Sequence, residues 1–218
     1  MKLAIFDLDN TLLNGDSDHT WGEFIIEKNL VDASSYKRQN DQFYQDYLDG
    51  CLDIDAYQEF ALQILTQFPK AKMEAIRKEF IHQKIVPMVL PKAQALVEQH
   101  RAQQHELLII TATNRFITQP IAELFKIAHL IATEPELKDG QYTGKISGIP
   151  SYSDGKIKRL EQWLAQSNCH YDYKYFYSDS HNDLPLLKTV DEAIAVNADD
   201  TLKRYAKQHD WQILDLTE

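Results

Sequence analysis

The stretch KLAIFDLDNTLLNGDSDHTW, residues 2–21, decides how this chain is interpreted. Its first part, Lys2–Phe6, is typical of a short buried strand, because the run is apolar and ends abruptly at polar residues. Asp7 and Asp9 follow at once, one residue apart. Two carboxylates this close repel each other and lose hydration when they are buried. We therefore expect another part of the chain, or an ion, to neutralise them.

The composition of the chain is that of an ordinary globular protein, with 218 residues, 44% hydrophobic residues and 26% charged residues. The length predicts one or two domains with a sizeable core. A formal net charge of -10 argues against a nucleic-acid partner, because Lys and Arg supply most of that affinity. Cys51 and Cys169 lie far apart and outside any CxxC pattern, which predicts neither a disulfide framework nor a zinc site.

The N-terminal pattern does not resemble a secretion signal, because Met1 and Lys2 precede an apolar run of only four residues. No window approaches the roughly 20 apolar residues that a membrane-spanning helix needs. We therefore expect a cytoplasmic protein with no membrane partner. The oligomeric state is left open by the sequence.

A block of helical pattern interrupts the chain after the first strand. Between about Asp16 and Lys84, apolar residues recur at spacings of three and four, and no strand is expected. The four segments read SDHTWGEFIIEKNL, SSYKRQNDQFYQDYLDG, DIDAYQEFALQILTQF and KAKMEAIRKEFIHQKI. We interpret them as four amphipathic helices that form an inserted all-α cap over residues 15–85.

The rest of the chain alternates between strand-like and helix-like segments. Strands are expected at residues 106–112, 128–133, 173–179, 192–198 and 211–216. Helices are expected at residues 92–104, 114–127, 154–167, 181–190 and 200–209. Asp139-Gly140 predicts a hairpin between two short runs within residues 136–148. This alternation predicts an α/β fold, a doubly wound parallel sheet built from residues 1–14 and 86–218, with helices on both faces.

Ligands of doubly wound sheets bind just beyond the carboxyl ends of the strands. The residues that follow the expected strands are therefore the candidates for a site, and we expect them to meet at one edge. They are Asp7, Asp9, Thr111, Ala112, Thr113, Lys156, Ser178, Asp179, Ser180, Asn182 and Asp183.

The four aspartates of this group, Asp7, Asp9, Asp179 and Asp183, predict a site with hard oxygen ligands. Mg²⁺ prefers such ligands and keeps several of its waters, and no soft ligand is at hand. A divalent cation would also offset the repulsion between the first two carboxylates.

The cationic and hydroxyl residues of the group predict a place for an anion. Lys156, the Thr111 hydroxyl and the N–H groups at the start of the following helix form an oxyanion cradle. A cation, a lysine and a helix N-terminus beside carboxylates suit a phosphoryl group in transit. One carboxylate can then attack phosphorus, while another protonates the leaving alcohol and activates water. We assign the first role to Asp7 and the second to the more exposed Asp9.

The segments FDLDNTLL, LLIITAT and SDSHND, together with Lys156, are similar to the four motifs of the haloacid dehalogenase superfamily of hydrolases. The order of the motifs, with a helical insert just after the first, resembles the phosphoserine phosphatase-like branch. The resemblance covers essentially the whole chain. It implies a Rossmann-like core with an inserted cap, and a phosphatase that acts on a small phosphomonoester.

The resemblance also implies a role for each matched residue. Asp7 is the nucleophile and a metal ligand, and Asp9 is the general acid and base, with its backbone carbonyl on Mg²⁺. Asp179 is a direct metal ligand, while Asp183 anchors a metal-bound water. The phosphate is bound by Thr111, Ala112, Lys156 and Asn182.

Four positions qualify this resemblance. The aspartate at position 9 favours phosphatase over dehalogenase chemistry, which does not need an acid for an alkoxide. Ser178 and Ser180 stand where the family pattern has glycine or often has it, and we expect them only to tighten the turn. Lys158, two residues beyond Lys156, is the alternative lysine for the phosphate.

The insert is expected to select the substrate. Asp16, nine residues past Asp7, matches the position where phosphoserine phosphatases place an acidic residue facing the substrate amine. Those enzymes also use a cap arginine for the substrate carboxylate, but none occurs here between Arg38 and Arg77. An acidic and aromatic cap would suit a phosphate ester that carries a cationic group and a ring, and histidinol phosphate is the leading hypothesis for the substrate. The residues that suggest it are Asp16, Asp18, Trp21, Phe24, Phe43, Tyr44 and Tyr47.

Several alternatives stay open at the level of sequence. Asp16 and Asp18 could cap the first insert helix, Thr111 and Thr113 could cap the helix after them, and Asp183 could be a helix N-cap. The aromatic residues could form the core of the helical bundle. A phosphomutase, or an inactive member that binds a phosphorylated ligand, would need the same core. A receiver domain shares the acidic pocket, but it has no insert and carries its phosphorylated aspartate on the third strand.

Overall fold

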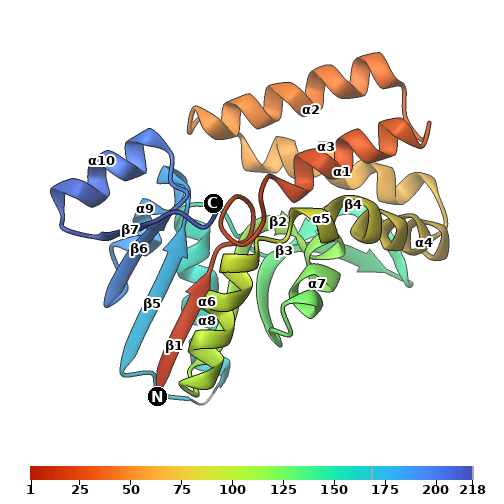
Figure 1. Ribbon diagram of the computed structural model, residues 1–218. Helices are drawn as coiled ribbons and strands as arrows, with labels where there is room; N and C mark the ends of the chain where they lie inside the picture. The colour runs from red at the N-terminus through yellow and green to blue at the C-terminus, as the bar shows by residue number, and fades with distance from the viewer. Residues whose placement is uncertain (168, 218) are drawn as a thin grey trace.

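The computed structural model describes residues 1–167 and 169–217. A seven-stranded sheet in the order β4-β3-β2-β1-β5-β6-β7 forms the body of the molecule, and the first four helices lie above one edge of it (Figure 1). Its strands are β1 (Lys2–Phe6), β2 (Glu106–Asn114), β3 (His129–Lys138), β4 (Gln141–Ser147), β5 (Tyr173–Ser178), β6 (Glu192–Val196) and β7 (Gln212–Leu214). All neighbouring strands are parallel except β3 and β4, which are antiparallel. The expected α/β architecture is confirmed.

The helices expected from the sequence are present, with small shifts at their ends. Those of the insert are α1 (Ser17–Glu27), α2 (Ala33–Leu48), α3 (Ile54–Gln67) and α4 (Lys70–Phe80). Those of the sheet are α6 (Pro91–Ala102), α7 (Arg115–Leu124), α8 (Asp154–Ser167), α9 (Leu184–Leu187) and α10 (Asp200–Gln208). A π-helical turn η1 (Ile81–Ile85) and a short helix α5 (Val86–Met88) extend α4, and a 3₁₀ turn η2 (His181–Asp183) precedes α9. Among the described helices, none is long and apolar enough to cross a membrane.

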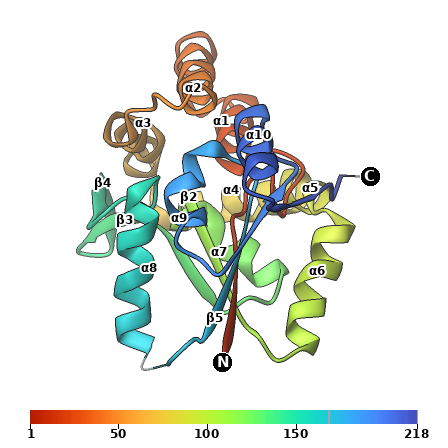
Figure 2. The ribbon, with the colours of Figure 1, turned by 90° about the vertical axis from the view of Figure 1, so that its left-hand side faces the viewer.

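The central strands bury both of their faces. On β1, Ala4 and Phe6 pack into the cluster that contains α6 and α7, while Leu3 and Ile5 pack into the cluster that contains α8, α9 and α10. Figure 2 shows α6 and α8 on opposite sides of the sheet. Alternate residues of a strand point to opposite faces, so an apolar run such as LAIF fills both layers. This packing fixes the carboxyl end of β1, and with it Asp7.

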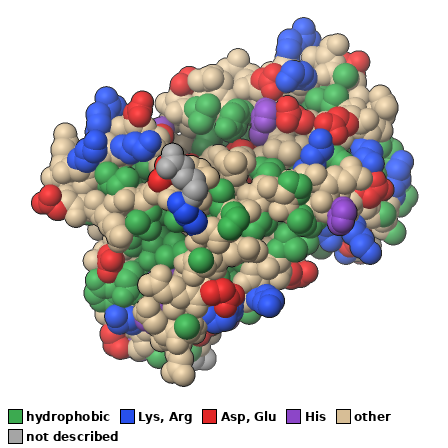
Figure 3. Space-filling model, in the orientation of Figure 1, with side chains coloured by type: hydrophobic (Ala, Val, Ile, Leu, Met, Phe, Trp, Pro, Cys, Tyr) green, Lys and Arg blue, Asp and Glu red, His purple; other side chains and the backbone are tan. Residues whose placement is uncertain are grey.

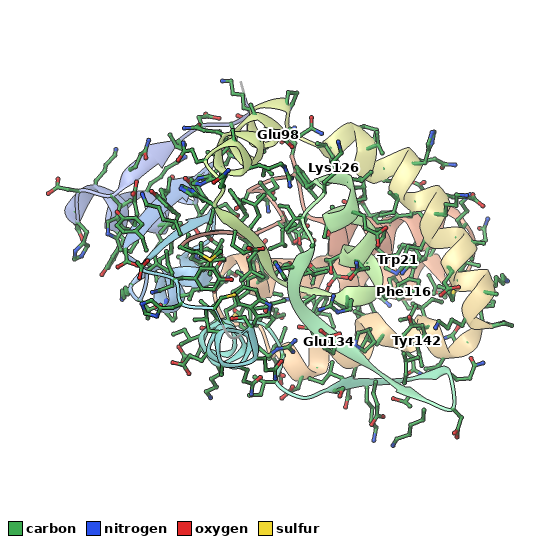
Figure 4. All side chains as sticks on the ribbon, turned by 90° about the horizontal axis from the view of Figure 1, so that it is seen from below. Trp21, Glu98, Phe116, Lys126, Glu134 and Tyr142 are labelled. Carbon is green, nitrogen blue, oxygen red and sulfur yellow. The ribbon has the colours of Figure 1, made fainter. Side chains whose placement is uncertain are left out.

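Three of the four helices of the insert begin at aspartates, and the insert has an aromatic core. Asp16, Asp32 and Asp53 each accept hydrogen bonds from N–H groups in the first turns of α1, α2 and α3. The rings of Trp21 and Phe116 lie 5.8 Å apart, and Phe116 in turn contacts Tyr142 (Figure 4). Trp21, expected to face a ligand, is thus part of the bundle core, and Phe24 and Phe80 pack beside it.

Two features differ from the expectation. The segments expected as a strand at 128–133 and the first arm of a hairpin form one continuous strand, β3, whose second half pairs with β4. This hairpin packs against α3 so closely that a Cβ at Gly144 would lie 3.1 Å from the Gln63 side chain. The helical run from α4 through α5 also passes the expected end of the insert at residue 85. The boundaries of the insert therefore stay a prediction.

The two chain segments that enter and leave the insert are hydrogen-bonded to each other. Asn14 N–H donates to Met88 C=O at 2.7 Å, and Leu90 N–H donates to Leu12 C=O at 3.2 Å. Leu13 and Val89 form an antiparallel bridge between them. The insert therefore leaves and rejoins the sheet at one point.

On the face shown in Figure 3, acidic and basic side chains are interspersed, so neither sign of charge dominates this face.

Candidate active site

Residues at the carboxyl ends of β1 and β2 form the lower wall of a cavity, namely Asp7, Asp9, Thr111, Ala112 and Thr113. We call this wall the floor, together with the buried side chains beside it, Lys156, Ser178, Asp179 and Asp183. At its centre is Asp7, only 4% exposed at the end of β1. Lys156, in the first turn of α8, places its Nζ atom 2.7 Å from Asp7 Oδ1 and 2.8 Å from Asp183 Oδ2. The Ser178 hydroxyl donates to the same Asp183 oxygen at 2.7 Å. The structure thus places Lys156 in the floor, whereas Lys158 is exposed.

The floor holds more negative than positive charge. The pKa of Asp7 is raised to about 7, because burial, Asp183 and Asp9 raise it by more than Lys156 lowers it. Burial likewise raises the pKa of Asp179 well above its usual range, with Asp7 and Asp183 adding to the effect. For Lys156, burial alone would lower the pKa, but the two carboxylates outweigh it and raise the pKa. One lysine therefore balances three buried carboxylates, those of Asp7, Asp179 and Asp183.

The donor atoms of the floor fit Mg²⁺. Within residues 1–167 and 169–217, no three His, Cys, Asp or Glu side chains are already grouped as metal ligands. The set expected from the sequence needs only two direct carboxylates, Asp7 and Asp179, with a backbone carbonyl and waters completing the shell. Mg²⁺ is bound by one or two carboxylates and retains several waters. The excess of buried negative charge also favours a divalent cation, so the residues of the floor fit Mg²⁺.

Asp9 is a floor residue that is also hydrogen-bonded to the insert. Its Oδ1 atom accepts a hydrogen bond from Ser17 N–H at 2.6 Å, and its Oδ2 atom accepts one from the Thr113 hydroxyl at 2.8 Å. Burial raises the pKa of Asp9 to about 7, with Asp16 contributing, and the bonds to Ser17 and Thr113 lower it. A carboxyl group that titrates near neutral pH can both release and accept a proton.

Thr111 and Ala112 line the cavity at the end of β2. The Thr111 hydroxyl accepts a hydrogen bond from Thr113 N–H at 3.2 Å, and Ala112 C=O accepts one from the Thr133 hydroxyl at 2.8 Å. Neither threonine caps the next helix, because β2 runs further than expected and Asn114 caps α7. Asp183 is not a side-chain cap either, since its carboxylate is bonded to Lys156 and Ser178.

Asn182 has a different environment from the one its predicted role suggests. It does not line the cavity. Its Nδ2 atom donates to Tyr47 C=O on α2 at 2.9 Å, and its Oδ1 atom accepts a hydrogen bond from the Tyr152 hydroxyl at 3.2 Å. Asn182 therefore connects the insert to the sheet, and a contact with phosphate stays a prediction.

The insert supplies the upper wall of the cavity, which we call the roof. The first residue of the roof along the chain is Asp16, the N-cap of α1. Its Oδ1 atom accepts hydrogen bonds from Asp18 N–H at 2.9 Å and His19 N–H at 2.7 Å. The roof is made by residues of α1, α2 and α3 and the loops beside them. They are Asp16, Asp18, His19, Asn40, Phe43, Tyr44, Tyr47, Leu52, Ile54 and Tyr57.

Sequence reasoning missed several supporting groups. The Thr11 hydroxyl donates to Asp179 at 3.1 Å, and the Ser178 hydroxyl, expected only to tighten a turn, bonds Asp183. Gln58 is fully buried on α3, where its Nε2 atom lies 3.5 Å from Ala112 C=O. A signal for Gln58 was available, because it is a polar residue on the apolar face of a predicted helix. For the Thr11 and Ser178 hydroxyls, the only signal in the sequence was that each lies close to an aspartate of a motif.

Comparison with known proteins agrees with this arrangement. Residues 4–188 match the family of haloacid dehalogenase-like hydrolases. The chain is 47% identical to a histidinol-phosphatase of Neisseria meningitidis serogroup C, over 98% of both chains. It is 26% identical to phosphoserine phosphatase SerB1 of Mycobacterium tuberculosis, covering 97% of this chain and 70% of that protein.

Solved structures show the same fold. A protein of unknown function from Bordetella pertussis Tohama I superimposes with a TM-score of 0.93 at 40% identity, covering 99% of this chain and 98% of that one. A phosphoserine phosphatase solved as an analogue of its phospho-aspartyl intermediate superimposes with a TM-score of 0.68 at 20% identity, covering 98% and 92%. On the family match and the likeness to curated phosphatases, this chain belongs to the haloacid dehalogenase-like hydrolases and is a phosphoric monoester hydrolase.

Proposed function

We propose that this chain hydrolyses histidinol phosphate, using Mg²⁺ and a phosphorylated Asp7. The observation that carries the proposal is that one cavity has carboxylates at both ends, Asp7 and Asp9 in the floor and Asp16 and Asp18 in the roof. The floor suits the phosphate and its metal, whereas the roof suits a cationic leaving group. Residues 15–85 would act as the cap that brings the roof over the floor.

The floor residues divide the reaction into two steps. In the first, an Asp7 oxygen forms a bond to phosphorus, the ester P–O bond breaks, and Asp9 gives its proton to the leaving alcohol. In the second, Asp9 takes a proton from water, the water oxygen attacks phosphorus, and Asp7 is released with inorganic phosphate. Lys156 keeps Asp7 in place and balances charge on the phosphoryl oxygens, with Thr111 and Ala112 beside them.

Mg²⁺, when bound, neutralises negative charge on the phosphoryl group. Asp7, Asp179 and the Asp9 carbonyl would hold it, with Asp183 anchoring one of its waters. Burial raises the pKa of Asp7 and of Asp179, and neighbouring carboxylates add to both shifts, so a bound cation would relieve their repulsion.

Two observations support histidinol phosphate over phosphoserine. The relative from Neisseria meningitidis, 47% identical over nearly its full length, is named a histidinol-phosphatase. In addition, none of the described residues that line the roof is Lys or Arg, so the roof offers no permanently charged cation for the carboxylate of phosphoserine. Arg77 lies elsewhere, donating to Phe116 C=O at 2.7 Å and stacking on the Phe116 ring.

The experiment is to measure phosphate release from histidinol phosphate, phosphoserine and several sugar phosphates, with Mg²⁺ and with EDTA. We expect EDTA-sensitive release with a clear preference for histidinol phosphate, and a phosphate on Asp7 that hydroxylamine removes, detected by mass spectrometry. A preference for phosphoserine would overturn the substrate assignment. Transfer of the phosphate within the substrate, without release, would indicate a mutase.

A further inference from the structure

The roof contains a buried carboxylate oxygen that has no partner. Four buried side-chain atoms lack a hydrogen-bond partner among the described residues, namely Ser17 Oγ, Asp18 Oδ2, Gln58 Oε1 and Ser151 Oγ. Of these residues, only Asp18 lines the cavity. Its side chain is in the first turn of α1 and is 6% exposed. A buried unpaired oxygen of this kind is unfavourable unless a ligand completes it.

The neighbouring acidic residue is already engaged. The Oδ1 atom of Asp16 accepts the two N–H bonds that begin α1, so Asp16 has a structural function that Asp18 does not have. Burial raises the pKa of Asp18 well above its usual range and Asp16 raises it further, while the Tyr57 hydroxyl lowers it only in part. The surroundings of Asp18 therefore lack the positive charge that an ionised carboxylate needs.

We propose that Asp18 is the residue that determines specificity, by binding an ammonium group on the alcohol part of the phosphomonoester. This inference rests on the function proposed above. It names the class of leaving group as an amino alcohol, which carries an ammonium group that other alcohols of similar shape lack. A charged N–H donor would pair with the free Asp18 oxygen and relieve its repulsion with Asp16. Tyr57, Tyr44 and Phe43 add aromatic surface to the same wall.

The test uses two esters that differ by a single group, L-histidinol phosphate and 3-(imidazol-4-yl)propyl phosphate, which lacks the amine. Their kcat/KM values are compared for the wild type and for Asp18→Asn, with Mg²⁺ present. We expect the wild type to prefer the amine about 100-fold, since losing one partner of a buried charge pair has an effect of this order. Asp18→Asn should reduce the preference to less than about 5-fold, mainly by slowing hydrolysis of the amine.

Three further variants make the result specific. Asp55→Asn removes the same charge from an exposed position on α3 and should leave both values unchanged. Asp16→Asn keeps a good N-cap residue and should reduce the preference less than Asp18→Asn does. Asp18→Glu keeps the charge and should retain part of the preference, which a purely structural role of Asp18 would not explain.

The outcomes separate this inference from the proposed function. Equal hydrolysis of the two esters by the wild type, or an unchanged preference in folded Asp18→Asn, would overturn the role of Asp18 while leaving the phosphatase chemistry intact. A larger loss of preference in Asp16→Asn than in Asp18→Asn would also overturn it. Failure of the wild type to hydrolyse either ester would instead overturn the proposed function. The wild-type comparison needs no variant and tests recognition of the ammonium group, and Asp18→Glu tests the residue itself if Asp18→Asn does not fold.

Discussion

The floor and the roof of the cavity treat buried polar groups in opposite ways. In the floor, Lys156 bonds Asp7 and Asp183, and Ser178 completes Asp183. On the side of the insert, Asp18 of the roof and Gln58 behind it on α3 are as deeply buried, yet each has an oxygen without a partner. A complete network holds its members rigidly, whereas an incomplete one lowers stability and leaves room for a ligand. The difference indicates that the floor is organised before substrate arrives and that the roof is completed by it.

The strongest test of the floor is Asp7→Asn. An amide cannot attack phosphorus as a carboxylate does, so we expect phosphate release to fall on the order of 10⁴-fold or more. The fold should be kept, because Lys156 retains its bond to Asp183. The measurement is steady-state hydrolysis of p-nitrophenyl phosphate together with thermal unfolding. Activity within tenfold of the wild type would contradict the assignment of Asp7 as nucleophile.

Lys156→Met tests whether the floor depends on its one buried cation. The variant leaves Asp7 and Asp183 buried without a counter-ion, and we expect the free energy of unfolding to fall by roughly 3–5 kcal/mol. Lys158→Met, the exposed neighbour, should change it by less than about 0.5 kcal/mol. Urea titrations of both variants give the comparison. Equal effects would show that the buried pair has no special weight.

Asp18→Asn should change the free energy of unfolding in the opposite direction to Lys156→Met, and by a smaller amount. Because the folded state raises the pKa of Asp18, the folded protein keeps a proton that the unfolded chain releases above about pH 4. This residue therefore favours folding at low pH and loses that contribution as pH rises through the folded-state pKa. At neutral pH we expect the variant to be more stable by about 1–2 kcal/mol.

The pH dependence provides the control for that variant. The difference in unfolding free energy between Asp18→Asn and the wild type should shrink as the pH falls below the folded-state pKa of Asp18. In that range the folded wild type takes up a proton on Asp18, which stabilises it, while the unfolded chain stays ionised down to about pH 4. Denaturant titrations between pH 8 and pH 5 measure it. A difference that does not vary with pH would mean that Asp18 does not titrate in this range.

Gln58→Met is the smallest of these effects. Replacing a buried amide whose oxygen has no partner with an apolar side chain of similar length should raise the free energy of unfolding by about 0.5–1 kcal/mol. Gln67→Met, at an exposed position near the end of the same helix, should have almost no effect. A loss of stability in Gln58→Met would show that its weak contact with Ala112 matters more than its unpaired oxygen.

The floor was more predictable from the sequence than the roof, for a physical reason. Asp7 and Asp179 follow apolar runs directly, and parallel strands bring their carboxyl ends to the same edge whatever the loops do. The place of Lys156 followed from the resemblance and from the helix that it begins. These predictions depend on local pattern and on one rule of topology.

The roof depends on how separate helices approach the sheet. The pattern offered helix caps as an alternative function for Asp16 and Asp18, but only the structure shows that Asp16 is the cap and Asp18 has the free oxygen. Asn182 bonds a helix 135 residues away in the chain, a contact that no local signal encodes. The continuity of β3 was missed for the same reason, because pairing with β4 decides it.

The bridge between Leu13 and Val89 has a consequence for the history of such chains. The segments before and after the insert are joined by backbone hydrogen bonds, so they can stay paired with each other whatever lies between them. A longer or shorter insert changes the loop entropy only slowly with length and leaves the strand register untouched. Inserts could therefore be exchanged at this junction, by evolution or by design, and give one hydrolytic core a new choice of substrate.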